Sequence, residues 1–261
     1  MTTIGLIGGT AAEFEAEWLE DLSIDTPWGP VTMHRGRMAE VEVLFVRRHG
    51  TGHTRLSSQV LHRENVWALK EAGCSAIIGT TVCGVVDGEV ELGTAIVFDD
   101  LFFPDNRLPD GSPCTVYDTP GDERRGHFIF GSPFSSTLRG ALLDAATDAG
   151  VAALARGVYA YMLGPRFNTR TEIAWLRSLG VTAVSQTAGP EAVLAGELEV
   201  PYALVGFGVD YANGVKAEPT PVDVLDANIA ESRRVFGQIV PGALRRLGEH
   251  PFDTGFVYRF E

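Results

Sequence analysis

The sequence is poor in the residues and runs that several large classes of protein require. Its three cysteines, Cys74, Cys83 and Cys114, are an odd number of isolated thiols without metal-binding spacing. Such cysteines favour a reducing cytoplasm over a disulfide framework. No apolar run reaches the length of about 18 residues that a transmembrane helix needs. The chain starts in a strand-like run with no basic segment before it, so we expect neither a signal peptide nor a membrane partner.

Positive charge is also scarce. The chain has 21 Lys and Arg residues against 34 Asp and Glu residues, which gives a formal net charge of −13. Because proteins bind nucleic-acid backbones with clusters of Lys and Arg, this composition argues against a nucleic-acid partner. It does not argue against a small anionic ligand, which a few Arg side chains and backbone N–H groups can hold inside an acidic protein.

Several common catalytic and cofactor motifs are missing. The sequence has no G-x-S-x-G turn of a serine hydrolase, and its six histidines include no H-E-x-x-H pair. Gly8-Gly9-Thr10 lacks both the lysine of a Walker A loop and the G-x-G-x-x-G pattern of a dinucleotide site. We therefore expect neither a metal ion nor a redox cofactor.

Apolar strand-like runs alternate with helical patterns along the chain, and 45% of its residues are hydrophobic. Strands are predicted over 3–7, 42–47, 75–79, 94–98, 157–162, 181–185 and 202–207, and helices over Ser57 to Ala72, Ser135 to Ala149, Arg170 to Leu179, Gly189 to Leu198 and Pro221 to Leu247. This alternation predicts an α/β fold, a single domain over residues 1–261 with a central mixed, largely parallel sheet flanked by helices. Ser57 and Ser58 lie at the expected N-cap of the first predicted helix, and Gly73 lies at its C′ position.

The segment from Phe103 to Arg125 departs from this alternation, because it is rich in Pro, Asp, Gly and Arg. Loops of this length inside a compact domain are usually functional or flexible. A lid, an arm that reaches a neighbouring subunit and a plain surface excursion are all compatible with its composition.

Glycine, hydroxyl and cationic residues directly follow three of the apolar runs. They are Gly8-Gly9-Thr10, Arg47-Arg48-His49-Gly50 and Thr80-Thr81-Val82-Cys83-Gly84. Loops at the carboxyl ends of neighbouring strands meet in one crevice of an open α/β sheet. Glycines let backbone N–H groups approach an anion, hydroxyls donate to its oxygens, and Arg and His supply charge. Together the three segments predict a site for phosphate or a similar oxyanion, held without a metal.

The three segments differ in how specific they are. Gly8-Gly9-Thr10 alone is also typical of a structural turn. Arg48-His49 is a stronger signal, because consecutive cationic side chains at the end of an apolar strand are unfavourable unless they face a ligand or solvent. Cys83 has no identifiable base partner that would activate its thiol, so we interpret it as a small packing residue and not as a nucleophile.

Two later segments could hold an organic group. Gly164-Pro165-Arg166-Phe167-Asn168-Thr169 places an aromatic ring beside polar groups, and such a ring can stack on a planar base or pack in the core. Asp210-Tyr211-Ala212-Asn213-Gly214 follows the run from Tyr202 to Phe207. A carboxylate there can accept a hydrogen bond from a ring nitrogen or an exocyclic amine, and desolvation would let it donate a proton.

In this order, the segments resemble those of trimeric purine nucleoside phosphorylases, and most of all the methylthioadenosine phosphorylase branch. The similarity covers most of the chain. It rests on Ile4-Gly5-Leu6-Ile7-Gly8-Gly9-Thr10, Asp25-Thr26-Pro27-Trp28-Gly29, Arg48-His49-Gly50 with His53-Thr54, Asn65-Val66-Trp67-Ala68-Leu69-Lys70, Thr80-Thr81-Val82-Cys83-Gly84, Gly164-Pro165-Arg166-Phe167, Pro190-Glu191-Ala192-Val193-Leu194-Ala195 and Asp210-Tyr211. Each motif alone is weak, but their order and spacing are specific.

The resemblance implies an enzyme, a pentosyltransferase in which phosphate attacks C1′ of a purine nucleoside and the base leaves. Phosphate would be a co-substrate, and no cofactor would be needed. The implied phosphate residues are Thr10, Arg48, His49, Thr81 and Thr187. The implied nucleoside residues are Val82, Cys83, Gly84, Phe167, Ser185, Gln186, Asp210, Ala212 and His127. Among these, Asp210 and His49 are the implied catalytic residues, and His127 would close the 5′ pocket of an adjacent subunit in a homotrimer.

Two positions depart from the family pattern. Gln186, in Ser185-Gln186-Thr187, stands where the family usually has Met, and we expect it to alter recognition of the sugar hydroxyls or the 5′ substituent. Ala212 stands where the aminopurine-preferring branch has the second acid of Asp-Tyr-Asp. The missing carboxylate leaves a 6-oxopurine or a modified base open as the substrate, because an unpaired polar group discriminates strongly between analogues.

Three functions remain open from the sequence. The first is phosphorolysis of a purine nucleoside with a modified 5′ position, such as 5′-methylthioadenosine. The second is a purine nucleoside hydrolase on the same architecture. The third is a non-catalytic nucleoside-binding relative, for which Gln186 and Ala212 are the motivation.

Overall fold

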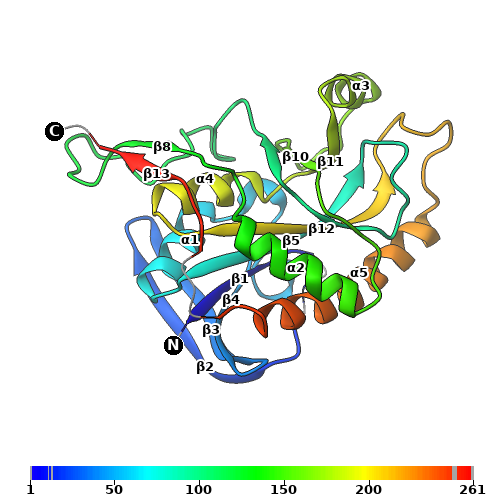
Figure 1. Cartoon of the computed structure of the whole chain (residues 1–261). Coiled ribbons are helices and arrows are strands. Elements are labelled where there is room, and N and C mark those ends of the chain that lie inside the picture. The colour runs from blue at the N-terminus through cyan, green and yellow to red at the C-terminus, as the bar shows by residue number, and fades with distance from the viewer. Residues whose placement is uncertain (1, 11, 13, 249–251, 260–261) are drawn as a thin grey trace.

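A computed structural model of the chain describes residues 2–10, 12, 14–248 and 252–259. Figure 1 shows a twisted sheet with helices packed against it. The strands are β1 (Thr3–Gly8), β2 (Glu17–Thr26), β3 (Gly29–Met38), β4 (Val41–Arg47), β5 (Ala76–Val85), β6 (Ala95–Val97), β7 (Asp100–Phe102), β8 (His127–Ile129), β9 (Ala153–Leu154), β10 (Val158–Tyr161), β11 (Val181–Ser185), β12 (Tyr202–Tyr211) and β13 (Phe256–Tyr258). The helices are α1 (His62–Glu71), α2 (Ser136–Asp148), α3 (Arg170–Ser178), α4 (Gly189–Glu197) and α5 (Val222–Leu244), with short 3₁₀ turns η1 (Thr51–His53) and η2 (Ser57–Gln59).

The eleven-stranded sheet is mixed, with a parallel centre. Its order is β2-β3-β4-β1-β5-β11-β10-β7, and β12 pairs with both β5 and β6. Parallel pairs join β1 to β4, β1 to β5 and β12 to β5, whereas β11 runs antiparallel to β5. The predicted mixed, largely parallel α/β fold is therefore confirmed. The parallel strands β1, β4, β5 and β12 bring their carboxyl ends to one edge of the sheet.

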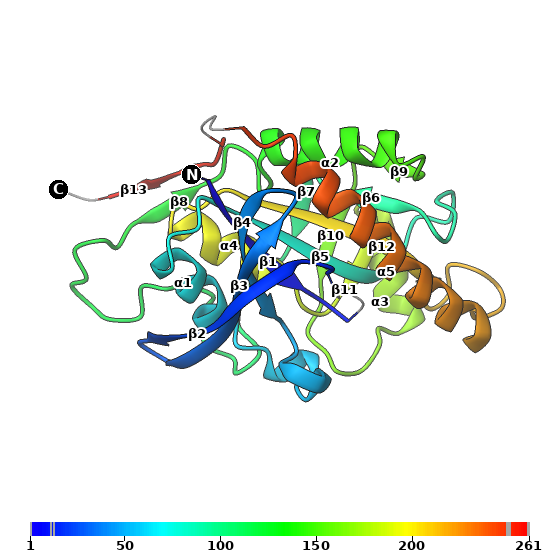
Figure 2. The ribbon, with the colours of Figure 1, turned by 90° about the horizontal axis from the view of Figure 1, so that it is seen from below.

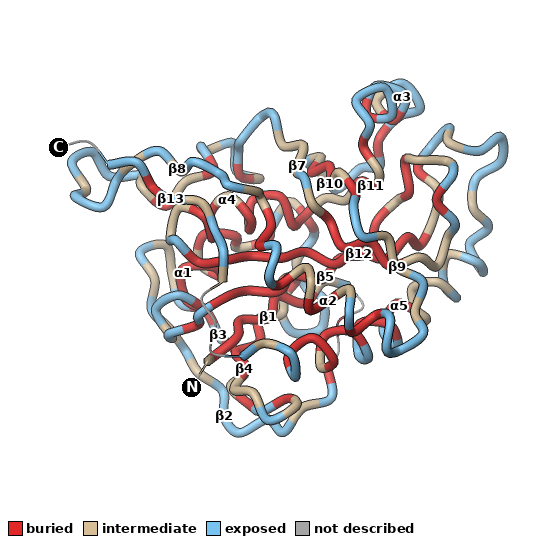
Figure 3. Tube along the Cα trace, viewed as in Figure 1, coloured by how far each residue is buried: buried red, intermediate tan, exposed pale blue. Residues whose placement is uncertain are grey.

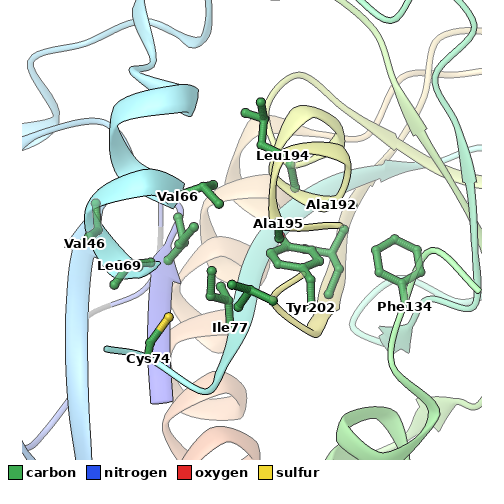
Figure 4. Close-up of a cluster of buried hydrophobic side chains, with 14 of the residues drawn as sticks. Val46, Val66, Leu69, Cys74, Ile77, Phe134, Ala192, Leu194, Ala195 and Tyr202 are labelled. Atoms are coloured by element: carbon green, nitrogen blue, oxygen red, sulfur yellow. The ribbon is translucent and has the colours of Figure 1, made fainter. Parts of the chain in front are cut away.

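Both faces of the central sheet are buried, because side chains alternate between the faces along each strand. In β5, Ile77 packs on the face covered by α1 and α4, whereas Ala76 and Ile78 pack on the face covered by α2 and α5. Figure 2 shows α2 and α5 side by side on that second face, and Figure 3 shows the buried strands between the layers. Figure 4 shows part of the apolar cluster on the face covered by α1 and α4. It includes Val66 and Leu69 of α1 and Ala192, Leu194 and Ala195 of α4, with Ile77 and Tyr202 of the sheet.

The hairpin of β2 and β3 was not predicted. Much of β2 is exposed and charged, so it contains no apolar run that would mark it as a strand. Its turn is specified locally, because the Thr26 hydroxyl donates to the carbonyl of Gly29 at 2.6 Å. Gly29 has a φ of 136°, a conformation that side chains disfavour.

Two boundaries differ from prediction, and one strand contains a register shift. Helix α1 begins at His62, and Ser57 lies in the separate turn η2, so the predicted N-cap at Ser57 and Ser58 is wrong. Strand β5 continues through Gly84 because β12 pairs along it, so Thr81 to Gly84 lie in a strand and not in a loop. A register shift in β12 between Gly208 and Asp210 sets Asp210 opposite Gly84. Such a bulge re-aims the side chains that follow it.

The long segment 103–125 is irregular, as predicted, and an isolated bridge joins its residues Arg107 and Pro113. Side chains of the β2–β3 turn and of α1 anchor it. The Trp28 ring nitrogen donates to Asp118 at 2.7 Å, and Arg63 donates to two of the segment's carbonyls. It leads into β8, which pairs with β13 in a two-stranded ribbon apart from the main sheet (Figure 1). In the described ranges, each helix is too short or too polar to cross a membrane.

Candidate functional site

A cavity of about 380 Å³ lies at the carboxyl edge of the parallel strands. Every predicted site residue except His127 lines it. These residues are Thr10, Arg48, His49, Thr81, Val82, Cys83, Gly84, Phe167, Ser185, Gln186, Thr187, Asp210 and Ala212. The structure therefore brings together segments that are up to 200 positions apart in the sequence, as expected for strand ends that meet at one edge of a sheet.

The predicted phosphate residues come from four strands, from within one of them and from the segments that follow the other three. Thr10 follows β1, Arg48 and His49 follow β4, Thr81 lies within β5, and Thr187 follows β11. Gly9 lets these segments approach one another, because a Cβ atom there would lie 2.6 Å from Nη1 of Arg48 and 2.9 Å from the Thr80 carbonyl. A glycine at this turn is therefore required by close packing.

The charge of Arg48 is already paired inside the protein. Its Nε and Nη2 donate to the two carboxylate oxygens of Glu191 at 2.5 and 2.8 Å, and its Nη1 donates to the Thr80 carbonyl. The Tyr202 hydroxyl also donates to Glu191, at 2.7 Å. Burial opposes the charge of Arg48, but the Glu191 carboxylate outweighs it and raises the pKa of the guanidinium. Arg48 lines the cavity with a fixed orientation and an internally balanced charge.

His49 does not supply the positive charge that the sequence suggested. Burial, and then the neighbouring charge of Arg48, lower the pKa of His49 to about 4, so the ring is neutral near pH 7. Its Nδ1 lies 2.9 Å from the carbonyl of Arg55, which can only accept. Nδ1 therefore carries the proton and Nε2 is an acceptor. The ring also stacks on His53, with centroids 4.2 Å apart.

A chain of hydroxyl groups leads from the cavity lining to the buried Tyr159. The Thr81 hydroxyl lies 3.0 Å from that of Ser185, which in turn lies 2.6 Å from the hydroxyl of Tyr159. The backbone N–H of Ala188 donates to Tyr159 at 3.0 Å. Burial raises the pKa of Tyr159 to about 12, so its hydroxyl stays protonated near neutral pH and can donate within this chain.

Other residues that line the cavity suit a planar organic group. The Phe167 side chain is 78% exposed, which excludes the alternative that it is a core residue. Burial raises the pKa of Asp210, which also lines the cavity. Cys83 is buried, and burial and then the neighbouring Asp210 raise the pKa of its thiol to about 12. A thiol that stays protonated is a poor nucleophile, which supports the interpretation of Cys83 as a packing residue.

The two departures from the family pattern have different surroundings. The carboxamide of Gln186 bonds within the protein: its Oε1 accepts from Ser57 and its Nε2 donates to the carbonyl of Arg166, both at 2.8 Å. Ala212 is buried in an apolar cluster with Ile173 and Val184. Its methyl group offers no polar contact to a ligand.

His127 lies outside this cavity, on the exposed ribbon strand β8 that pairs with β13. A residue there cannot contribute to the cavity of its own chain. Its predicted role in the site of an adjacent subunit stays a prediction.

Sequence reasoning missed several cavity residues: His53, Leu56, Ser57, Asn168, Asn213, Leu225 and Ile229. His53, Asn168 and Asn213 lie within motifs that the sequence did single out, so proximity to those motifs was a usable signal. Leu225 and Ile229 come from α5, where an apolar residue facing a ligand has the same pattern as one facing the core. In the part of the chain that the structure describes, no group of three or more His, Cys, Asp or Glu side chains is arranged to hold a metal ion.

Comparison with known proteins shows similarity over most of the chain. The family model of the phosphorylase superfamily matches residues 3–245. The 6-oxopurine nucleoside phosphorylase of Pyrococcus furiosus is 35% identical over 224 residues, which cover 84% of this chain and 83% of the relative. The probable S-methyl-5′-thioinosine phosphorylase of Methanopyrus kandleri is 36% identical over 236 residues, which cover 89% and 88%.

A solved structure extends the likeness to the fold. A mutant of the adenosine/methylthioadenosine phosphorylase of Schistosoma mansoni, in complex with methylthioadenosine, aligns with a TM-score of 0.84 at 25% identity. The alignment covers 96% of this chain and 93% of that one. Since the family model spans nearly the whole chain and both relatives exceed 30% identity, the protein belongs to the phosphorylase superfamily.

Proposed function

We propose that the protein catalyses the phosphorolysis of a purine nucleoside, releasing the free base and a pentose 1-phosphate. The observation that carries this proposal is that two chemically different sets of groups line one cavity. Glycine and hydroxyl groups with Arg48 form one set, which we assign to the first side, and the exposed ring of Phe167 with Asp210 forms the other, which we assign to the second side. This is the arrangement that two substrates, an oxyanion and a planar base, require.

On the first side, we assign phosphate binding to Thr10, Arg48, His49, Thr81 and Thr187. Two-point contact with Glu191 fixes the Arg48 guanidinium, which keeps free N–H groups that can face the cavity. The neutral His49 would accept a hydrogen bond from a protonated phosphate oxygen. Phosphate held in this way is oriented toward C1′, and its charge stabilises the positive charge that develops on the sugar as the bond to the base breaks.

On the second side, we assign base stacking to Phe167 and leaving-group assistance to Asp210. Because burial raises the pKa of Asp210, its carboxyl group retains a proton more readily than an exposed one. A protonated carboxyl can donate to N7 of the purine as the base leaves. Val82, Cys83, Gly84 and Ser185 would line the space for the nucleoside between the two sides.

The substrate that we propose carries a modified 5′ position, such as a methylthio group. The relatives named above are a 6-oxopurine nucleoside phosphorylase and a probable S-methyl-5′-thioinosine phosphorylase. Ala212 favours a 6-oxopurine as a second candidate base, because its methyl group cannot accept a hydrogen bond from a 6-amino group. Turnover of adenosine compared with that of inosine and guanosine distinguishes a 6-amino from a 6-oxo base.

We also propose that residues 1–261 act as one domain and assemble as a cytoplasmic homotrimer. The match of the family model to residues 3–245 supports a single unit. The position of His127 on the ribbon, outside the cavity of its own chain, supports a role in a neighbour's 5′ pocket. Three buried free thiols support a reducing compartment.

Phosphate dependence of base release tests the proposal. Purified protein is assayed with adenosine, inosine, guanosine and their 5′-methylthio and 5′-deoxy analogues, with and without phosphate. We expect base release only with phosphate, together with an equal amount of pentose 1-phosphate. Release of free sugar without phosphate would instead identify a hydrolase, and binding of a nucleoside without turnover would identify a non-catalytic relative.

A further inference from the structure

The exposed ring of Phe167 lies between two backbone carbonyls that are held by side-chain amides. Nε2 of Gln186 donates to the carbonyl of Arg166 at 2.8 Å, and Nδ2 of Asn213 donates to the carbonyl of Asn168 at 2.7 Å. Gln186 follows β11 and Asn213 follows β12, so the peptide group before Phe167 and the peptide group after Asn168 are tied to two different strand ends.

Gln186 is itself fixed at its other end. Its Oε1 accepts from the Ser57 hydroxyl, and this assignment of the amide is the one that serves both partners, since the Arg166 carbonyl can only accept. Gly164 packs directly on this hydrogen bond. A methyl group at residue 164 would overlap the Gln186 oxygen and the Ser57 hydroxyl. The loop therefore passes close to Gln186 because a glycine stands at this point.

Helix α3 holds the same loop from outside. Glu172 accepts from both terminal nitrogens of Arg166 at 2.7 and 2.9 Å, and from the backbone N–H of Thr169 at 2.7 Å. The Phe167 ring, in contrast, is mostly exposed and gains little orientation from packing. Its position is consequently set by the backbone that carries it.

We propose that Gln186 and Asn213 are positioning residues, which hold the Phe167 ring over the cavity for stacking on the base. The inference rests on the proposed function and goes beyond it, because it assigns to Gln186 an action through Phe167 in place of a contact with the sugar. We call the two hydrogen bonds from Gln186 and Asn213 to the loop the clamp. A ring that is already oriented loses less conformational freedom when it stacks on a ligand, so the clamp increases the affinity for the nucleoside.

Limited proteolysis tests the clamp without any ligand. Trypsin cleaves after Arg166, and the carbonyl of that scissile bond is the one that Gln186 holds. In Gln186→Met and Asn213→Ala we expect cleavage at Arg166 to accelerate about fivefold or more, since each variant loses one hydrogen bond to the loop. Cleavage at the exposed Arg124 and Arg125 is the internal reference, and Gln238→Met on α5 is the matched control. An unchanged rate at Arg166 in both variants would overturn the clamp.

A double-mutant cycle tests the action through Phe167. Dissociation constants for 5′-methylthioadenosine and inosine are measured by calorimetry for the native protein, Gln186→Met, Phe167→Ala and the double variant. We expect Gln186→Met to weaken binding about fivefold in the native background and to have almost no effect when Phe167 is absent. The same cycle is made with Asn213→Ala. The KM for phosphate should stay within twofold throughout.

The outcomes separate the two proposals. If the effects of the two substitutions in a cycle add, Gln186 or Asn213 contacts the nucleoside directly, and the positioning role is overturned. The proposed function would still stand in that case, provided that turnover depends on phosphate. If the native protein binds neither nucleoside, the proposed function fails, and the tryptic cleavage at Arg166 still decides whether the clamp exists.

Discussion

Arg48 and Glu191 form a doubly hydrogen-bonded ion pair in which the side chains are 0% and 1% exposed. The pair joins the residue after β4 to the first turn of α4, 143 positions apart in the sequence. Tyr202 adds a hydrogen bond to the carboxylate, and the Thr80 carbonyl adds one to the guanidinium. The pair is therefore both a link between the sheet and α4 and the device that orients one wall of the cavity.

Loss of the carboxylate should be strongly destabilising. In Glu191→Gln, the guanidinium of Arg48 stays buried without a counter-charge, so we expect the free energy of unfolding to fall by about 3 to 5 kcal/mol. Urea denaturation at pH 7 measures this change. The matched control is Glu231→Gln, which removes an exposed partner of Arg234 on α5 and should leave stability nearly unchanged. A small effect at Glu191 would mean that water or another group balances Arg48.

His49→Ala should act on phosphate more than on the nucleoside. The variant loses the Nε2 acceptor and the stacking contact with His53, so we expect the KM for phosphate to rise about tenfold and the KM for the nucleoside to change less than twofold. Steady-state kinetics with each substrate varied in turn measure both. His34→Ala, on the hairpin and away from the cavity, is the control. Equal losses for both substrates would contradict a phosphate role for His49.

Asp210→Asn should shift the base preference toward 6-oxopurines. An asparagine amide donates to O6 without needing a bound proton, so we expect the ratio of kcat/KM for inosine to that for adenosine to rise about tenfold. Because the protonated carboxyl is the donor, native activity on adenosine should fall as pH rises through the raised pKa of Asp210, and the variant should lose that dependence. The exposed Asp223→Asn serves as the control. An unaltered ratio would show that Asp210 does not read the base.

His62 should make the protein sensitive to mild acid. It is 2% exposed, and burial, partly offset by Glu191, lowers its pKa to about 4 from an ordinary 6.5. Between these values the unfolded chain binds a proton that the folded protein does not, so stability falls as pH decreases from 6.5 to 4. In His62→Phe, the loss of unfolding free energy between pH 7.5 and 4.5 should be about 2 kcal/mol smaller. Urea denaturation at both pH values gives the difference, with His34→Gln as the surface control.

The alternating apolar runs predicted the fold class well, because a sheet covered on both faces needs continuous apolar strands. The β2–β3 hairpin lacked this signal, since much of β2 faces solvent. The continuation of β5 through Thr81 to Gly84 was missed for a different reason. Its strand conformation depends on pairing with β12, whose residues lie more than a hundred positions later.

Many of the residues that line the cavity were visible in the sequence, because they lie in polar and aromatic segments next to apolar runs or at positions that the family resemblance implies. The sequence by itself determined the α/β class, the segments that meet at the carboxyl edge and the resemblance to a family. Only the tertiary structure decided that Arg48 is paired with Glu191, that the His49 ring is neutral near pH 7, and which groups bond to Gln186. Charge balance and hydrogen-bond pairing depend on neighbours that are distant in sequence, and burial strengthens both, so they arise when the chain folds.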